Sequence, residues 1–74
     1  MSTTATYRVT GMTCDHCVRA VTDELTALPG VRDVGVDLVV GGTSIVRVVS
    51  DVALADSAVR DAIDEAGYTL VGTT

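Results

Sequence analysis

Hydrophobic side chains follow two kinds of spacing along this chain, and the spacing predicts its secondary structure. Strict alternation predicts short strands, whereas stripes with three- and four-residue spacing predict amphipathic helices. In chain order we expect a strand at 5–10, a helix at 15–28, strands at 34–38 and 45–49, a helix at 55–66 and a strand at 68–71. Residues 72–74 are expected to be a frayed end.

The two predicted helices each have one apolar side. The first is expected to bury a stripe made of Val18, Val21, Leu25 and Leu28, and Pro29-Gly30 should end it. The second is expected to bury Ala55, Ala58, Val59, Ala62, Ile63 and Ala66, with Gly67 just beyond its last turn. In the strand at 45–49, Val46 and Val48 should face inward because Arg47 between them should face water.

The order of these elements predicts the fold. Strand, helix, strand, strand, helix, strand is the split βαβ arrangement, in which a four-stranded antiparallel sheet carries both helices on one face. We therefore expect an α+β, ferredoxin-like βαββαβ sandwich. It uses nearly the whole chain, so residues 1–74 are expected to form a single domain.

Length and charge narrow the class of function. The chain has 74 residues, which is too short for an enclosed active-site cleft, so a carrier or binding module is expected rather than an enzyme. Five arginines, no lysine and ten acidic residues give a net charge of −5, which argues against nucleic acid as a partner. No apolar run approaches the ~20 residues of a membrane span and the first residues do not resemble a signal peptide. We expect a cytoplasmic chain that does not insert into a membrane.

The candidate chemistry lies in the sequence Gly-Met-Thr-Cys-Asp-His-Cys at 11–17. Cys14 and Cys17 stand three residues apart where the first helix begins, with Thr13 or Cys14 at the expected N-cap. The positive end of the helix favours thiolates, above all that of Cys17. Two soft anions suit a soft cation of low coordination number, and the second cysteine pair of a structural zinc site is missing. Monovalent copper is the predicted metal, although silver, mercury and zinc would also bind such a pair.

These residues resemble a known family. The Gly11-Met12-Thr13-Cys14-x-x-Cys17 motif, the βαββαβ order and Ala66-Gly67-Tyr68 are similar to the heavy-metal-associated domain family, which includes small copper chaperones and the N-terminal metal-binding domains of copper-transporting P-type ATPases. The resemblance implies that Cys14 and Cys17 hold Cu(I) and pass it by ligand exchange to the metal-binding domain of such an ATPase. It also implies that Met12 packs under the loop and that Tyr68 lies beside the site.

Several alternatives stay open at this point. The chain can be an N-terminal domain of a copper ATPase, or a thiol-disulfide oxidoreductase, although Thr13 stands where thioredoxin-like sites have tryptophan and no proline separates the cysteines.

His16 is expected to face solvent, and the alternative is that it serves as a third metal ligand. Asp15 is expected to be a helix-end residue. The metal-free chain should be a monomer, and a metal-bridged dimer is the alternative for the loaded form. The acidic surface is interpreted as solvated, with attraction to a basic partner as the alternative.

Overall fold

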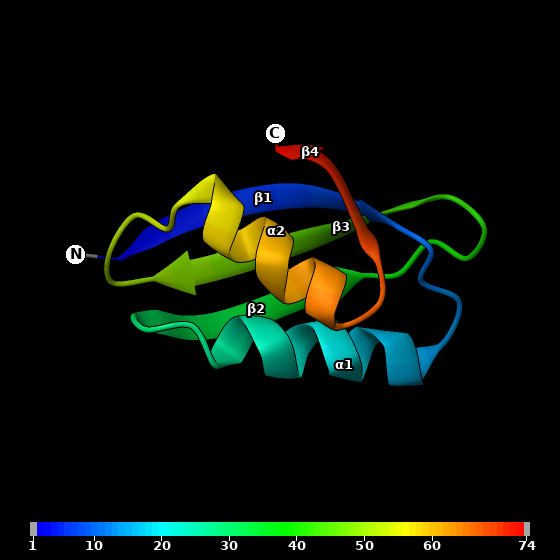
Figure 1. Cartoon of the computed structure of the whole chain (residues 1–74), viewed down its shortest axis with the longest axis horizontal. Coiled ribbons are helices and arrows are strands. Elements are labelled where there is room, and N and C mark those ends of the chain that lie inside the picture. The colour runs from blue at the N-terminus through cyan, green and yellow to red at the C-terminus, as the bar shows by residue number, and fades with distance from the viewer. Residues whose placement is uncertain (1, 74) are drawn as a thin grey trace.

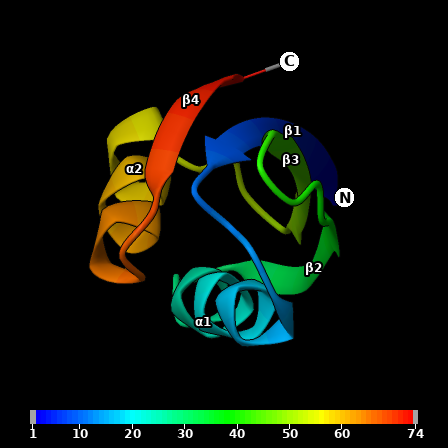
Figure 2. The ribbon, with the colours of Figure 1, turned by 90° about the vertical axis from the view of Figure 1, so that its right-hand side faces the viewer.

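The computed structural model describes residues 2–73, and these residues form one sheet and two helices (Figure 1). In chain order the elements are β1 (Thr3–Thr10), α1 (Asp15–Thr26), β2 (Val31–Asp37), β3 (Thr43–Ser50), α2 (Asp56–Glu65) and β4 (Thr69–Thr73). The sheet has the order β2-β3-β1-β4, and each neighbouring pair of strands is antiparallel. Both helices lie on the same face of this sheet (Figure 2). The expected ferredoxin-like βαββαβ fold is confirmed.

The ends of several elements differ from the predictions. β1, β2 and β3 begin earlier than expected, at residues 3, 31 and 43, because backbone pairing between strands continues beyond the alternating side chains. α1 ends at Thr26 rather than at residue 28, since the N–H of Leu28 donates to the carbonyl of Leu25 at 3.1 Å in a tighter turn.

The predicted frayed end was wrong for Gly72 and Thr73. Both belong to β4, where they pair with Arg8 and Tyr7 of β1. Pairing with a central strand satisfies their backbone groups, and the side-chain pattern of the last residues does not reveal it. Thr74 lies outside the described residues.

The core lies between the sheet and the two helices. It includes Val21 and Leu25 of α1 and Val59 and Ile63 of α2, all fully buried. From the sheet it includes Val9 and the inward pair predicted for β3, Val46 and Val48.

Two details of the predicted helix stripes were wrong. The buried side of α1 begins at Cys17 and continues through Val21 and Leu25, whereas Val18 is only half-buried. In the second predicted helix, Ala55 precedes α2 and is exposed. The direction in which α1 packs on the sheet selects Cys17 rather than its neighbour, and this turns one of the two candidate thiols toward the core.

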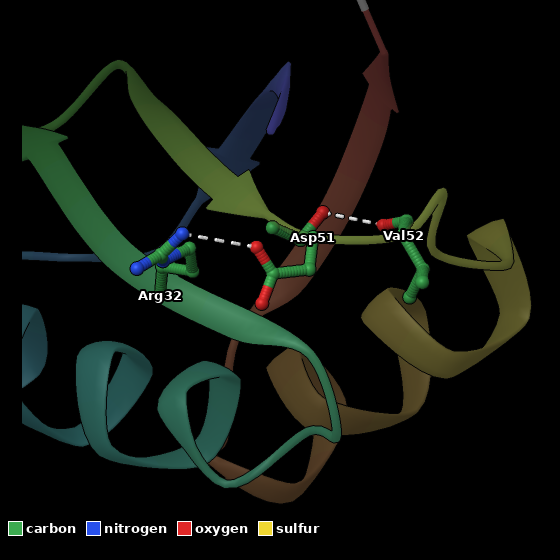
Figure 3. Close-up of polar contacts among 4 residues, drawn as sticks. Arg32, Asp51 and Val52 are labelled. Carbon is green, nitrogen blue, oxygen red and sulfur yellow. Dashed lines mark hydrogen bonds and ion pairs between the residues drawn. The ribbon is translucent and has the colours of Figure 1, made fainter. Parts of the chain in front are cut away.

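The two ends of the sandwich are built differently. At one end, the connection after β3 is joined to the connection between α1 and β2, because the N–H of Asp51 donates to the carbonyl of Gly30 at 2.8 Å. Arg32 and Asp51 form an ion pair of 3.2 Å beside it (Figure 3). Both charged groups are largely exposed, so this pair contributes at most about 1 kcal/mol.

The opposite end holds the candidate chemistry. The β1–α1, β2–β3 and α2–β4 connections all lie there (Figures 1 and 2). Thr10, the last residue of β1, pairs with Thr43 at the start of β3 and with Thr69 at the start of β4.

Neither helix of the described chain has the length and apolar character that a bilayer-crossing helix requires.

Candidate metal centre

The loop between β1 and α1 is shaped by its first two residues. Gly11 has a φ of +97°, a left-handed conformation that favours glycine and turns the chain out of the sheet. Met12 then places its side chain in the core, where it is 1% exposed. The expectation that Met12 packs under the loop is confirmed. Its thioether sulfur therefore serves packing rather than the surface.

The helix start determines how the two cysteines are presented. Cys14 is the N-cap of α1, and its carbonyl accepts hydrogen bonds from the N–H groups of Cys17 at 3.0 Å and Val18 at 3.3 Å. No side chain caps the helix, so the N-cap role predicted for this position is confirmed in its backbone form. Both cysteines are free; Cys14 is exposed and Cys17 is buried. Their sulfurs are 3.6 Å apart.

Thr13 contacts the sulfur of Cys17 with two polar groups, and the sequence did not predict this contact. Its backbone N–H donates to the Sγ of Cys17 at 3.5 Å, and its Oγ1 lies 3.7 Å from the same sulfur. The sequence predicted a capping role for Thr13 and no contact with Cys17. Its position four residues before Cys17, at the entry to a helix, is the pattern that places both groups near that sulfur.

Tyr68 reaches the site from the other helix. The N–H of Gly67 donates to the backbone carbonyl of Asp64 at 2.9 Å, and the N–H of Tyr68 donates to the backbone carbonyl of Ile63 at 3.1 Å. These are the two hydrogen bonds of a Schellman motif, which ends α2. Gly67 has a φ of +95°, as this motif requires. The ring of Tyr68 lies against Gly11, where a Cβ added to the glycine would be 3.5 Å from Tyr68 Cδ1. The expectation that Tyr68 lies beside the cysteine loop is confirmed.

The surroundings of Cys17 favour its thiolate. The N–H of Thr13 lowers the pKa of Cys17 most, followed by a hydrogen bond from the Tyr68 side chain, while burial acts in the opposite direction. Together they lower the pKa of Cys17 to about 6. The same hydrogen bond raises the pKa of Tyr68, because the phenol is a donor to the thiolate only while it keeps its proton. These contacts therefore favour the thiolate of Cys17 over its thiol, relative to an ordinary cysteine.

The other polar residues of the motif lie on the surface. His16 and Asp15 are both exposed. His16 lines a shallow depression along the outer side of α1 together with Arg19, Ala20 and Asp23. Within residues 2–73, no three His, Cys, Asp or Glu side chains are grouped in a way that would hold a metal ion. The structure brings Cys14 and Cys17 together and leaves His16 on a different side of the helix.

The chemistry of this arrangement follows from its two sulfurs. Their separation of 3.6 Å is less than twice the ~2.3 Å of a zinc–thiolate bond, so both can contact a single ion. Thiolates select soft cations such as Cu(I). The exposed Cys14 keeps one side of such an ion accessible from outside. The site therefore suits a metal ion that is exchanged, and it differs from a closed structural metal site.

Comparison with known proteins adds the following findings. Residues 6–69 match the heavy-metal-associated domain family. The chain is 40% identical over 63 residues to the copper chaperone CopZ of Bacillus subtilis, covering 85% of this chain and 88% of that protein. It is 38% identical over 65 residues to the copper chaperone CopZ of Staphylococcus saprophyticus, covering 88% of this chain and 93% of that protein.

A solved structure gives a similar result. The N-terminal domain of a potential copper-translocating P-type ATPase from Bacillus subtilis, in its Cu(I)-loaded state, superposes with a TM-score of 0.78 at 26% sequence identity. The superposition covers 100% of this chain and 92% of that one. This chain and that ATPase domain thus share one fold over almost their full lengths.

Proposed function

The chain belongs to the heavy-metal-associated domain family, and from this premise we propose that it is a copper metallochaperone. It binds Cu(I) as cargo through the sulfurs of Cys14 and Cys17 and passes the ion to the metal-binding domain of a copper-transporting P-type ATPase. The observation that carries the proposal is the sulfur pair, 3.6 Å apart at a helix N-terminus. Residues 1–74 act as one non-catalytic domain in the cytoplasm, a reducing compartment that keeps both cysteines as thiols.

Transfer follows from the unequal exposure of the two sulfurs. A thiolate of the acceptor approaches the ion from the side of Cys14, because Cys17 is covered by the protein. The ion is then shared between sulfurs of both proteins before the acceptor holds it alone. Hydrogen bonds from Thr13 and Tyr68 to the Cys17 sulfur stabilise its thiolate when the ion has been passed on.

A second candidate is the N-terminal domain of a copper ATPase, and the likeness to the Bacillus subtilis ATPase domain favours it. Metal binding would then be the same, but transfer would occur within a larger membrane protein. The mass of the native protein purified from its host separates the two candidates. A chaperone has the 7.6 kDa of this chain, and an ATPase is many times larger.

The test of metal binding is an anaerobic titration with Cu(I) against a chromophoric competitor, followed by X-ray absorption spectroscopy of the loaded chain. We expect one ion per chain, an absorption edge typical of Cu(I), and sulfur as the neighbouring atom type. A stoichiometry below one half, or a first coordination sphere made of nitrogen and oxygen, would contradict the two-cysteine site.

A further inference from the structure

The turn between β2 and β3 exposes two large hydrophobic side chains. Val39 is 46% exposed and Val40 is 66% exposed, although both stand in a turn where polar residues are usual. We call residues 38–42 the valine turn. Two of the four large hydrophobic residues that are exposed within residues 2–73 lie in this turn; of the others, Val52 lies in the β3–α2 connection and Val71 in β4.

The valine turn lies beside the cysteine loop. Thr43, which follows the turn, pairs with Thr10, which precedes Gly11 and the cysteines. Both connections therefore leave the sheet at the same end of two neighbouring strands. Figure 2 views the molecule from this end, and the β1–α1 loop and the green β2–β3 turn both lie toward the viewer.

The valine turn is held in one conformation by a buried serine. The N–H of Val39 donates to Ser44 Oγ at 2.9 Å, and the N–H of Gly42 donates to the carbonyl of Val39 at 3.2 Å. Ser44 is fully buried on β3, so its hydroxyl serves the turn rather than solvent. A fixed turn loses little conformational entropy when it is covered by a partner.

Charge is absent from the two segments that form the valine turn and lead to the cysteines, and the exposed Asp15 and Glu65 lie at the border of this surface. Residues 9–14 and 38–44 contain no Asp, Glu, Lys or Arg, whereas the whole chain has ten acidic and five basic residues. The charged residue next to the turn, Asp37, is paired with Arg47 at 3.4 Å. Depletion of charge at the centre, with polar residues around it, is the pattern of a protein–protein interface.

We propose that the valine turn is part of the surface on which the copper acceptor docks. The inference rests on the proposed function, because an acceptor thiolate has to come within bonding distance of an ion held by Cys14 and so must cover the surface beside it. The occupant is a second heavy-metal-associated domain from another protein, with an apolar, uncharged surface around its own cysteines. A second copy of this chain is disfavoured, since each copy has a net charge of −5 and like charges repel.

The experiment compares two valines of similar exposure at opposite ends of the molecule. Val40→Ser changes the turn, and Val52→Ser changes the connection after β3, where Val52 is 56% exposed. The first and last residues of β3, Thr43 and Ser50, are seven steps apart, so the strand separates the two sites by about 23 Å at ~3.3 Å per step. The probe acceptor is the N-terminal domain of the Bacillus subtilis copper ATPase. The measurements are the Cu(I) affinity of each chain and the second-order rate constant of copper transfer to that domain.

We expect Val40→Ser to lower the transfer rate constant about fivefold, because it removes apolar area that the acceptor buries, and Val52→Ser to leave it unchanged. Cu(I) affinity should be the same in all three chains. Equal transfer rates, or an equal loss in both variants, would overturn the docking surface while leaving the proposed function intact. An unaltered chain that binds no Cu(I) or transfers none would contradict the proposed function itself.

Two further measurements complete the test. Ser44→Ala keeps both valines but removes the hydroxyl that fixes the turn, and we expect it to slow transfer as well. Val40→Thr keeps the branched shape and should reproduce the loss seen with serine. Sedimentation of the copper-loaded chains tests the other occupant, because a dimer that Val40→Ser weakens without slowing transfer would assign the turn to a second copy and overturn the proposal.

Discussion

The backbone N–H of Thr13 points at the sulfur of Cys17 across the first turn of α1, at 3.5 Å. The two residues lie on opposite sides of the N-cap, Cys14, so the contact exists only when the helix has begun. A backbone donor cannot be removed by changing the side chain of Thr13. The largest effect that lowers the pKa of Cys17 therefore comes from the fold of the backbone. The hydrogen bond from the Tyr68 side chain lowers this pKa further, and a mutation of Tyr68 can remove it.

The first prediction concerns the pKa of Cys17, which is lowered to about 6. In the metal-free Cys14→Ser chain, where only one thiol titrates, we expect Tyr68→Phe to raise this pKa because the phenol donor is lost. Thr13→Val should raise it less, since the Thr13 N–H remains and its hydroxyl is a smaller contribution. Thiolate absorbance against pH measures both. An unchanged midpoint in Tyr68→Phe would show that the phenol does not contact the sulfur.

The same lowered pKa predicts how stability depends on pH. Between about pH 6 and the ordinary value of 9.0, the folded chain has released the Cys17 proton and the unfolded chain still holds it. The free energy of unfolding should therefore rise with pH across this range, and the contribution is lost as pH falls through about 6. Urea unfolding of the metal-free chain measures the slope. Cys17→Ser is the control, and a slope that persists in it would assign the effect to other groups.

The second set of variants tests the metal ligands. Cys14→Ser and Cys17→Ser should each lower Cu(I) affinity by orders of magnitude, since one sulfur remains. Circular dichroism should show that both variants stay folded. Cys14 is exposed, so its variant should have unchanged stability, whereas Cys17→Ser buries a hydroxyl and should lose about 1 kcal/mol. Near-native affinity in either variant would contradict the site.

The core is tested by placing a charge in each helix. Val21→Asp and Ile63→Asp should unfold the chain with or without copper, because both side chains are fully buried and an unpaired carboxylate there costs several kcal/mol. Arg19→Asp, on the exposed side of α1, is the matched control and should change stability by less than about 0.5 kcal/mol. Thermal unfolding separates them. An unchanged melting curve for Val21→Asp would mean that α1 faces the sheet differently.

The last prediction concerns His16. Because this side chain lines the outer side of α1 with Arg19 and Asp23, we expect His16→Ala to keep one Cu(I) per chain and to change affinity by less than about tenfold, or ~1.4 kcal/mol. Competitor titrations of both chains from about pH 6 to 8 cover the range in which histidine changes charge. A hundredfold loss confined to the variant would establish His16 as a ligand.

The sequence by itself determined the order of the elements, the ferredoxin-like fold and the cysteine pair. These depend on spacing between near neighbours in the chain: alternation for strands, stripes for helices, and three residues between two thiols at a helix start. The inward facing of Val46 and Val48 was predictable for the same reason, since Arg47 between them requires solvent.

Only the tertiary structure decided which thiol is buried and what surrounds it. The packing angle of α1 turns Cys17 rather than Val18 toward the core, and the turn after α2 brings Tyr68 to a loop more than fifty residues earlier in the chain. The pairing of Thr10 with Thr43 likewise sets the valine turn beside the cysteines. Such relationships join residues far apart in sequence, and no local periodicity encodes them because they arise when separate elements pack together.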